Sequence, residues 1–357
     1  MRMNPLRLIA CSVAFFSAAL APGAAALAHA PRDAAGGTSA RTSSGAPALH
    51  APSDAGPVAT YSIVGYDPAN GDLGIAVQSK FFAVGAVVPW AKAGVGAVAT
   101  QSYANTSFGP RGLALLAEGK SPREALDALL AADGDSTRRQ AGIVDAKGRS
   151  ASFTGRGCNA WAGGVAGENF AAQGNILVGE ETVRALAETF VNTQGPLADR
   201  LVAALAAGQA AGGDSRGMQS AVLLVVRAAG GYGGFDDRYI DLRVDDAGDP
   251  IAELQRLLKI QHSMGLLTEA MNLYRKGDRA AAVAAAEQAV ALDPGSADCA
   301  YDLACYYALT GRRDDALASL ARAVEINPRM AKMAAGDKDL ESLRGDAEFQ
   351  KIIVVAK

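Results

Sequence analysis

Two neighbouring stretches of apolar and β-branched residues predict a β-hairpin around residue 70. The first covers residues 60–67 with partial alternation, and residues 73–79 repeat the pattern. The intervening residues 68–72 are rich in Pro, Asn, Gly and Asp, which favour a turn. Thr60 therefore opens the first strand and Lys80 ends the second. Burial of a lysine at the end of an apolar strand is costly unless its charge is needed.

The same pattern analysis predicts further elements in groups. Strands are expected at residues 84–90, 94–101, 139–145, 149–154, 170–178, 219–227 and 239–244, and helices at residues 109–118, 121–132, 180–191 and 196–207. Ser121, Pro122 and Glu124 form a capping box at the start of the second helix. Groups of strands separated by helix pairs favour antiparallel sheets with helices on their outer faces over βαβ units. The sequence thus predicts an α+β domain over residues 59–260, built as a four-layer α-β-β-α sandwich.

A second, all-helical module follows. After a helix at residues 251–260, four pairs of residues recur at a spacing of 34: Gly277 and Gly311, Ala282 and Ala316, Ala289 and Ala323, Pro294 and Pro328. This period resembles the tetratricopeptide repeat, and two repeats are expected over residues 263–328. In the remaining residues 329–357 a further helix at 339–355 is expected to cap the stack with its apolar side chains, which are Leu340, Leu343, Phe349, Ile352 and Ile353.

The N-terminal residues have the pattern of a secretory signal peptide. In residues 1–30 two arginines precede an apolar run, and small residues follow, so cleavage is expected after Ala28 or Ala30. The run is too short to span a membrane comfortably, and Cys11 follows too few residues for a lipoprotein signal. Residues 31–58 have the composition of a flexible linker. We expect a protein exported to the periplasm or secreted, with no membrane span in its mature form.

Charge and the histidine and cysteine positions exclude several classes of function. The 357 residues carry a net charge of −3 with no basic block, so no nucleic-acid partner is expected. The histidines are His29, His50 and His262, all outside the predicted sandwich core, which excludes a catalytic triad and a histidine-rich zinc site there. Cys158, Cys299 and Cys305 have neither disulfide-framework nor metal-ligand spacing. No metal or organic cofactor is expected.

Thr60 and Lys80 are candidates for chemistry that needs no imidazole. A threonine at a chain terminus is a nucleophile because its own α-amine serves as general base. The ordinary pKa of an α-amine is roughly 7.7–8.0, near the working range of a base, and a nearby ammonium lowers it further. The alternative is an ordinary strand threonine and an ordinary strand end, since β-branched residues favour strands.

Several segments resemble the bacterial family catalogued as domain of unknown function 1028. In chain order they read TYSIV at 60–64, AVQSKF at 76–81, VGAVVPW at 84–90, GVGAVATQ at 94–101, QGNIL at 173–177, GQAAGGD at 208–214 and RYIDLRVDD at 238–246. The resemblance covers residues 59 to about 260 and implies the N-terminal-nucleophile hydrolase fold. It gives Thr60 the nucleophile position, with Lys80 beside it. Oxyanion stabilisation would come from backbone N–H groups helped by Asn175, and Asp241 would be the partner of Lys80.

Residue type alone leaves Asn175 and Asp241 open to other roles, a turn-capping amide and a strand-end carboxylate. The favoured interpretation is an exported amide hydrolase acting on a small amide substrate, with residues 263–357 serving a protein partner or self-association. A free Thr60 amine requires a second cut after Ala59, because about thirty residues of linker precede it once the signal is removed. The alternative is a non-catalytic binding or scaffold protein with the same fold.

Overall fold

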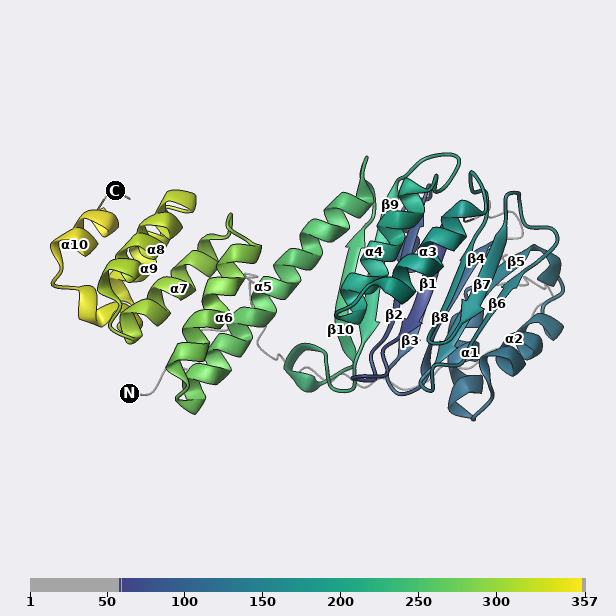
Figure 1. The fold of residues 1–357 in the computed structure, drawn as a ribbon, viewed down its shortest axis with the longest axis horizontal. Coiled ribbons are helices and arrows are strands. Elements are labelled where there is room, and N and C mark those ends of the chain that lie inside the picture. The colour runs from purple at the N-terminus through teal and green to yellow at the C-terminus, as the bar shows by residue number, and fades with distance from the viewer. Residues whose placement is uncertain (1–57, 59, 355–357) are drawn as a thin grey trace, which may run out of the picture. The chain divides into compact units, whose positions relative to one another are not determined.

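The computed structural model describes residue 58 and residues 60–354 (Figure 1). The signal peptide predicted for residues 1–30 and nearly all of the linker predicted for residues 31–58 lie outside the described residues. Within the described residues, no helix is both long enough and apolar enough to cross a membrane.

The first domain is mixed α/β with two antiparallel sheets. The six-stranded sheet has the order β10-β9-β2-β1-β8-β7, and the four-stranded sheet has the order β3-β4-β5-β6. The strands are β1 (Thr60–Tyr66), β2 (Leu73–Ser79), β3 (Pro89–Lys92), β4 (Gly96–Ser102), β5 (Arg139–Asp145), β6 (Ser150–Thr154), β7 (Gly163–Gly167), β8 (Phe170–Gly174), β9 (Ser220–Val226) and β10 (Arg238–Val244). β1 lies inside its sheet, paired with β2 on one side and β8 on the other.

Each sheet carries two helices on one face. α1 (Phe108–Ala117) and α2 (Pro122–Ala131) bury Phe108 and Leu129 against Ile143 of the four-stranded sheet. α3 (Glu181–Asn192) and α4 (Leu197–Ala210) cover the six-stranded sheet (Figure 1) and bury Leu186 and Leu201 against it. At the start of α2 the predicted capping box is present, since the side chain of Ser121 and that of Glu124 each accept a hydrogen bond from the other residue's backbone N–H.

The opposite faces of the two sheets share one apolar cluster. It contains Val64, Leu73, Ile75 and Val77 from the six-stranded sheet and Ala97, Ala99 and Val144 from the four-stranded sheet. All are fully buried. Because strand side chains alternate between faces, residues at the intervening positions of the same strands point toward the helices. β1 therefore directs Thr60, Ser62 and Val64 toward the other sheet.

Two predicted strands differ from the structure, and one strand was not predicted. Residues 84–90 form a 3-10 turn, η2 (Val84–Ala86), before the short strand β3. β8 ends at Gly174, and Ile176 two residues later has a left-handed φ of 53° that cannot continue a strand. β7 was not predicted, because its glycine-rich sequence at the sheet edge has no apolar run. Further 3-10 turns are η3 (Ser136–Arg138) and η4 (Tyr232–Gly234).

One long helix, α5 (Pro250–Lys276), continues past the predicted helix end at residue 260. Ile251 and Leu254 in its first half belong to the apolar cluster beneath α4, while Ala270 in its second half belongs to the C-terminal helical cluster. The Asp249 side chain caps its start by accepting the Ala252 N–H. Gly277, at φ 91°, ends the helix in the left-handed conformation that glycine adopts readily.

The helices after α5 stack around small residues. They are α6 (Arg279–Leu292), α7 (Ala297–Leu309), α8 (Arg313–Ile326), α9 (Arg329–Gly336), the 3-10 turn η5 (Lys338–Leu343) and α10 (Ala347–Val354). The repeated alanines Ala282, Ala289, Ala316 and Ala323 are fully buried. The single helix predicted at 339–355 is divided into η5 and α10, but both contribute buried residues, including Leu340 and Phe349, to the helical cluster.

Candidate functional site

Thr60 is fully buried at the start of β1, facing the space between the two sheets. Its hydroxyl oxygen lies 2.9 Å from the Val58 carbonyl oxygen and 3.0 Å from Ser79 Oγ. Ser79 is the residue directly opposite Thr60 on β2. The Thr60 hydroxyl is therefore held between the backbone that precedes it and a second hydroxyl.

The Thr60 carbonyl is fixed by amide donors. It accepts the Asn175 backbone N–H at 3.0 Å and Gln101 Nε2 at 3.2 Å. Asn175 Nδ2 lies 3.5 Å from the same carbonyl and donates to Gln140 Oε1 at 2.9 Å. The structure thus brings Asn175 into direct contact with Thr60, and it places the residue at the turn that follows β8.

Four amide side chains continue these contacts across both sheets. We call Gln101, Gln140, Gln173 and Asn175 the amide cluster; all four are fully buried. Gln101 Nε2 donates to Gln140 Oε1 at 2.9 Å, and Gln173 Nε2 donates to Ser62 Oγ at 2.7 Å. Ser62 Oγ in turn donates to Gln101 Oε1 at 2.6 Å. Buried amides that are hydrogen-bonded in this way hold their neighbours in a defined arrangement.

Two polar atoms on residues that contact Thr60 or Val58 lack partners. Within the described residues, Asn175 Oδ1 and Ser102 Oγ are buried without a hydrogen-bond partner. Ser102 has φ 66° and Ile176, next to Asn175, has φ 53°. The left-handed region is unfavourable for residues with a Cβ, and especially for a β-branched one. Unpartnered polar atoms and strained backbone at one place are typical of functional sites.

The prediction that the Lys80 side chain lies beside Thr60 is wrong. The register Thr60↔Ser79 places Lys80 one residue beyond, where strand alternation turns it to the other face. Its side chain is exposed, and Nζ donates to the Met218 carbonyl at 3.1 Å. Ser79 takes the place expected for lysine.

The pairing predicted between Asp241 and Lys80 is also wrong. Asp241 lies on β10, separated from β1 by β9 and β2. Its carboxylate accepts hydrogen bonds from Arg238 at 2.6 Å and Arg243 at 2.8 Å. This ion pair raises the pKa of the Arg243 guanidinium. Asp241 therefore lies in the middle of β10, in an ion pair with two arginines, and is neither the partner of Lys80 nor the strand-end carboxylate of the alternative interpretation.

The acidic residue near the end of β2 is Asp214. Its side chain is fully buried, accepts the Lys80 backbone N–H at 3.2 Å and pairs with Arg216 at 2.8 Å.

Tyr61, beneath α4, donates to Gln209 Oε1 at 3.0 Å. Burial raises the pKa of the Tyr61 phenol well above its ordinary value, and the negative charges of Asp214 and Asp249 add to this. Tyr61 is thus a neutral hydrogen-bond donor that fixes the helix side of β1.

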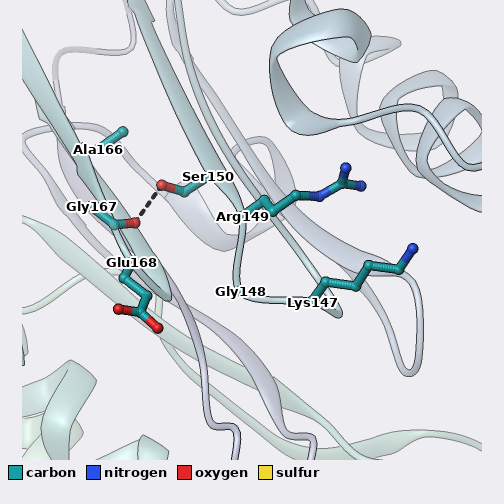
Figure 2. A pocket seen from close by; sticks show the side chains of 7 residues that line it. All are labelled: Lys147, Gly148, Arg149, Ser150, Ala166, Gly167 and Glu168. Carbon is teal, nitrogen blue, oxygen red and sulfur yellow. Dashed lines mark hydrogen bonds between the residues drawn. The ribbon is translucent and has the colours of Figure 1, made fainter.

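Other candidate sites lie elsewhere. A shallow pocket is formed by the β5–β6 and β7–β8 turns (Figure 2), and is lined by Lys147, Gly148, Arg149, Ser150, Ala166, Gly167 and Glu168. It lies by the Phe170 end of β8, whereas Thr60 lies by the Gly174 end. Among the described residues, no group of three acidic, histidine or cysteine side chains is arranged to hold a metal ion. Cys299 is buried, which raises the pKa of its thiol.

Comparison with known families identifies the first domain. A family model described as a family of unknown function (DUF1028) matches residues 60–254. The chain belongs to the DUF1028 family. The crystal structure of a DUF1028 protein from Silicibacter pomeroyi is similar, with 30% sequence identity, a TM-score of 0.51 and coverage of 56% of this chain and 88% of that chain. The resemblance inferred from the sequence motifs is thereby confirmed, and the family match begins at Thr60.

The C-terminal helices match a second family model. A tetratricopeptide repeat model matches residues 273–335, which confirms the repeats predicted from the 34-residue spacing. Helical repeats of this type suggest protein interaction. A comparison with curated proteins finds no match for the chain.

Proposed function

We propose that the DUF1028 domain of this chain is an amide hydrolase of the N-terminal-nucleophile type, with Thr60 as nucleophile after a cut between Ala59 and Thr60. The observation that carries this proposal is the Thr60 hydroxyl itself. It is buried at the start of an interior strand, between the Val58 carbonyl and the Ser79 hydroxyl. The two facing sheets with helix pairs on their other faces support the four-layer α-β-β-α sandwich of such hydrolases.

The proposed self-cleavage uses the Thr60 hydroxyl against its own preceding bond. Oγ1 adds to the Ala59 carbonyl carbon, the bond from that carbon to the Thr60 nitrogen breaks, and the hydroxyl proton ends on the nitrogen as part of the new α-amine. Water then hydrolyses the ester between Ala59 and Oγ1, which restores the hydroxyl and leaves a carboxyl group on Ala59. The mature chain begins at Thr60.

In each later turnover the α-amine is the proposed base. It takes the hydroxyl proton while Oγ1 attacks the substrate carbonyl, and it passes that proton to the leaving amine; water then releases the acyl group. Because the ordinary pKa of an α-amine, roughly 7.7–8.0, already suits a base, no lysine is needed to tune it. We propose Asn175 Oδ1 and Ser102 Oγ, two unpartnered acceptors on residues that contact Thr60 and Val58, as the candidates to accept hydrogen bonds from the new amine.

Asn175 has a different proposed role from the oxyanion donor that the resemblance implied. Its backbone N–H and its Nδ2 are both directed to existing acceptors, the Thr60 carbonyl and Gln140 Oε1. We assign it as a positioning residue for Thr60, whose effect on the nucleophile passes through these hydrogen bonds.

The test is the N-terminal residue of purified protein, read by intact mass, in three chains. Wild type and Thr60→Ser are expected to yield a fraction that begins at residue 60, because both keep a hydroxyl. Thr60→Val has nearly the same shape without the hydroxyl and is expected to remain uncut. A wild-type chain that carries Ala59 in every molecule contradicts the hydrolase proposal and favours the non-catalytic binding protein. Equal cutting in Thr60→Val assigns the cut to another protease.

A second role follows from the tetratricopeptide match. We propose that residues 263–357 bind a protein partner or a second copy of the chain, since such repeats suggest protein interaction. We also propose that the chain is exported, on the pattern of residues 1–30. Cell fractionation tests export: a protein retained in the cytoplasm with its initiator methionine contradicts it.

A further inference from the structure

The residue two positions before Thr60 is held as a strand by the opposite sheet. The Val58 N–H donates to the Ser102 carbonyl at 2.6 Å, and the Ser102 N–H donates to the Val58 carbonyl at 3.1 Å. β3 pairs with β4 from Lys92↔Gly96 to Pro89↔Ala99. Ser102 faces Arg139 of β5 on its other side. Val58 thus takes a place on the β3 side of β4, past the end of β3.

Val58 is bound by its side chain as well as by its backbone. It is 5% exposed and belongs to the apolar cluster between the sheets, together with Val84 and Val88. Two backbone hydrogen bonds and one buried aliphatic side chain are the contacts by which proteins bind extended peptides at a sheet edge. Departure of Val58 leaves the N–H and C=O of Ser102 unpaired in a buried place, which favours a replacement strand.

From these contacts we infer that the edge of β4 at Ser102 is the acyl-side binding site for an extended peptide substrate. This rests on the proposed function, in which the segment ending at Ala59 is the first substrate of Thr60. Val58 is then the second residue on the acyl side of the cut bond. A later substrate must bring its carbonyl to the same hydroxyl, so the contacts that hold Val58 are available to its equivalent residue.

The site defines a substrate class. The substrate has a peptide N–H and C=O at the second acyl-side residue, which pair with Ser102, and an aliphatic side chain there, which enters the cluster around Val84 and Val88. A charged side chain at that position is excluded, because it would be buried among apolar residues without a counter-charge. An amide whose acyl group lacks a peptide bond makes none of the main-chain contacts. Peptides are therefore favoured over simple small-molecule amides.

The test uses a chain that begins at Thr60, released from an N-terminal fusion by a protease that cuts directly before that residue. This chain retains every member of the four apolar clusters except Val58. The probe is the hexapeptide Asp-Ala-Gly-Pro-Val-Ala, the sequence of residues 54–59. Its binding is followed by calorimetry and by protection of the Ser102 amide from hydrogen exchange.

Two altered peptides make the test specific. N-methylation of the valine removes the donor to Ser102 and is expected to weaken binding about fivefold or more. Replacement of the valine by aspartate is expected to weaken it by roughly tenfold to a hundredfold. Binding that protects Ser102 and shows both losses supports the inference. Absence of Ser102 protection, or equal binding of all three peptides, overturns it.

This binding experiment and the test of cleavage at Thr60 can give different answers. If the wild-type chain is cut at Thr60 but its mature form does not bind the hexapeptide, the hydrolase proposal stands and the peptide-site inference is refuted. If the wild-type chain is never cut, but the chain starting at Thr60 binds the hexapeptide with the expected dependence on the valine, the peptide-binding edge is supported and the hydrolase proposal is refuted.

Discussion

Gln140 offers the sharpest test of how the candidate site is held together. Its Nε2 lies 2.9 Å from Thr154 Oγ1, 3.2 Å from the Gly163 carbonyl and 2.7 Å from the Gly174 carbonyl. Its Oε1 accepts from Gln101 and Asn175, each at 2.9 Å. One buried side chain on the four-stranded sheet thus joins residues of both sheets, including Gln101 and Asn175, which both contact the Thr60 carbonyl.

Gln140→Leu keeps the approximate volume and removes all of these contacts. The two Nε2 protons and two Oε1 acceptor sites amount to about four hydrogen bonds, at roughly 1 kcal/mol net each. Burial of the leucine side chain offsets part of this loss, by about 1–2 kcal/mol. The free energy of unfolding is therefore expected to fall by roughly 2–3 kcal/mol. Gln101 and Asn175 keep their contacts to the Thr60 carbonyl, so the fold itself is expected to survive.

The assay is urea denaturation followed by tryptophan fluorescence. The chain has two tryptophans, Trp90 and Trp161, and both lie in the DUF1028 domain, so the signal reports on that domain. Gln255→Leu, on the exposed face of α5, is the matched control and is expected to change stability by less than about 0.5 kcal/mol. A loss below about 1 kcal/mol for Gln140→Leu refutes the reasoning that these hydrogen bonds hold the site.

Gln140→Glu tests the direction in which stability changes with pH. The carboxylate cannot donate to the two glycine carbonyls, and burial raises the pKa of such a group above its unfolded value. The protonated form then supplies part of the stability, which is present below the unfolded pKa and lost as pH rises through the folded pKa. Destabilisation is expected to be larger at pH 7 than at pH 4. An equal loss at both values contradicts the buried position of the group.

Two further predictions concern α5 and the C-terminal helices. A hydrogen bond to Asp199 raises the pKa of His262, so the contribution of this pair to stability is present below about pH 6.5 and is lost as pH rises through the folded pKa. His262→Gln should therefore lower the free energy of unfolding by up to about 1 kcal/mol at pH 5.5 and by less at pH 8. An equal loss at both pH values contradicts a stabilising charge on His262. Phe349 is fully buried in the helical cluster, so Phe349→Ala should lower the free energy of unfolding of the C-terminal helices by about 3–5 kcal/mol, measured by far-UV circular dichroism, without moving the tryptophan fluorescence transition. Val354→Ala, at an exposed position, is the control and should change little. A shift of both transitions in Phe349→Ala shows that the two modules unfold together.

Most elements could be predicted from local sequence, because each depends on side chains close together in the chain. Residues 73–79 form β2 with the predicted bounds, and the box at Ser121 caps α2. The errors occur where local preference is overruled. Residues 84–90 are apolar enough for one strand, yet Ala83 at φ 52° opens a 3-10 turn there. The C-terminal apolar residues were found, but the break between η5 and α10 was not.

The candidate site was only partly predictable. Thr60 came from the strand pattern and the family resemblance, and Asn175 came from its residue type; the structure brings these two together. The prediction for Lys80 is wrong by one residue. The pairing register decides which side chains of β2 face Thr60, and a shift of one residue reverses the face. Asp241 fails because strand order, which no local pattern contains, puts two strands between it and β1.

The sequence by itself determined the family, the repeat period and the residues able to form each strand, since motifs and periodicity depend on the order of side chains alone. The tertiary structure alone decided which polar residues matter. Ser62, Gln101 and Gln140 occupy alternate positions on their strands and resemble the solvated face of a sheet. A second sheet covers that face, so these residues are buried and must bond one another across it. Burial from a segment far along the chain turns an ordinary polar position into part of a site.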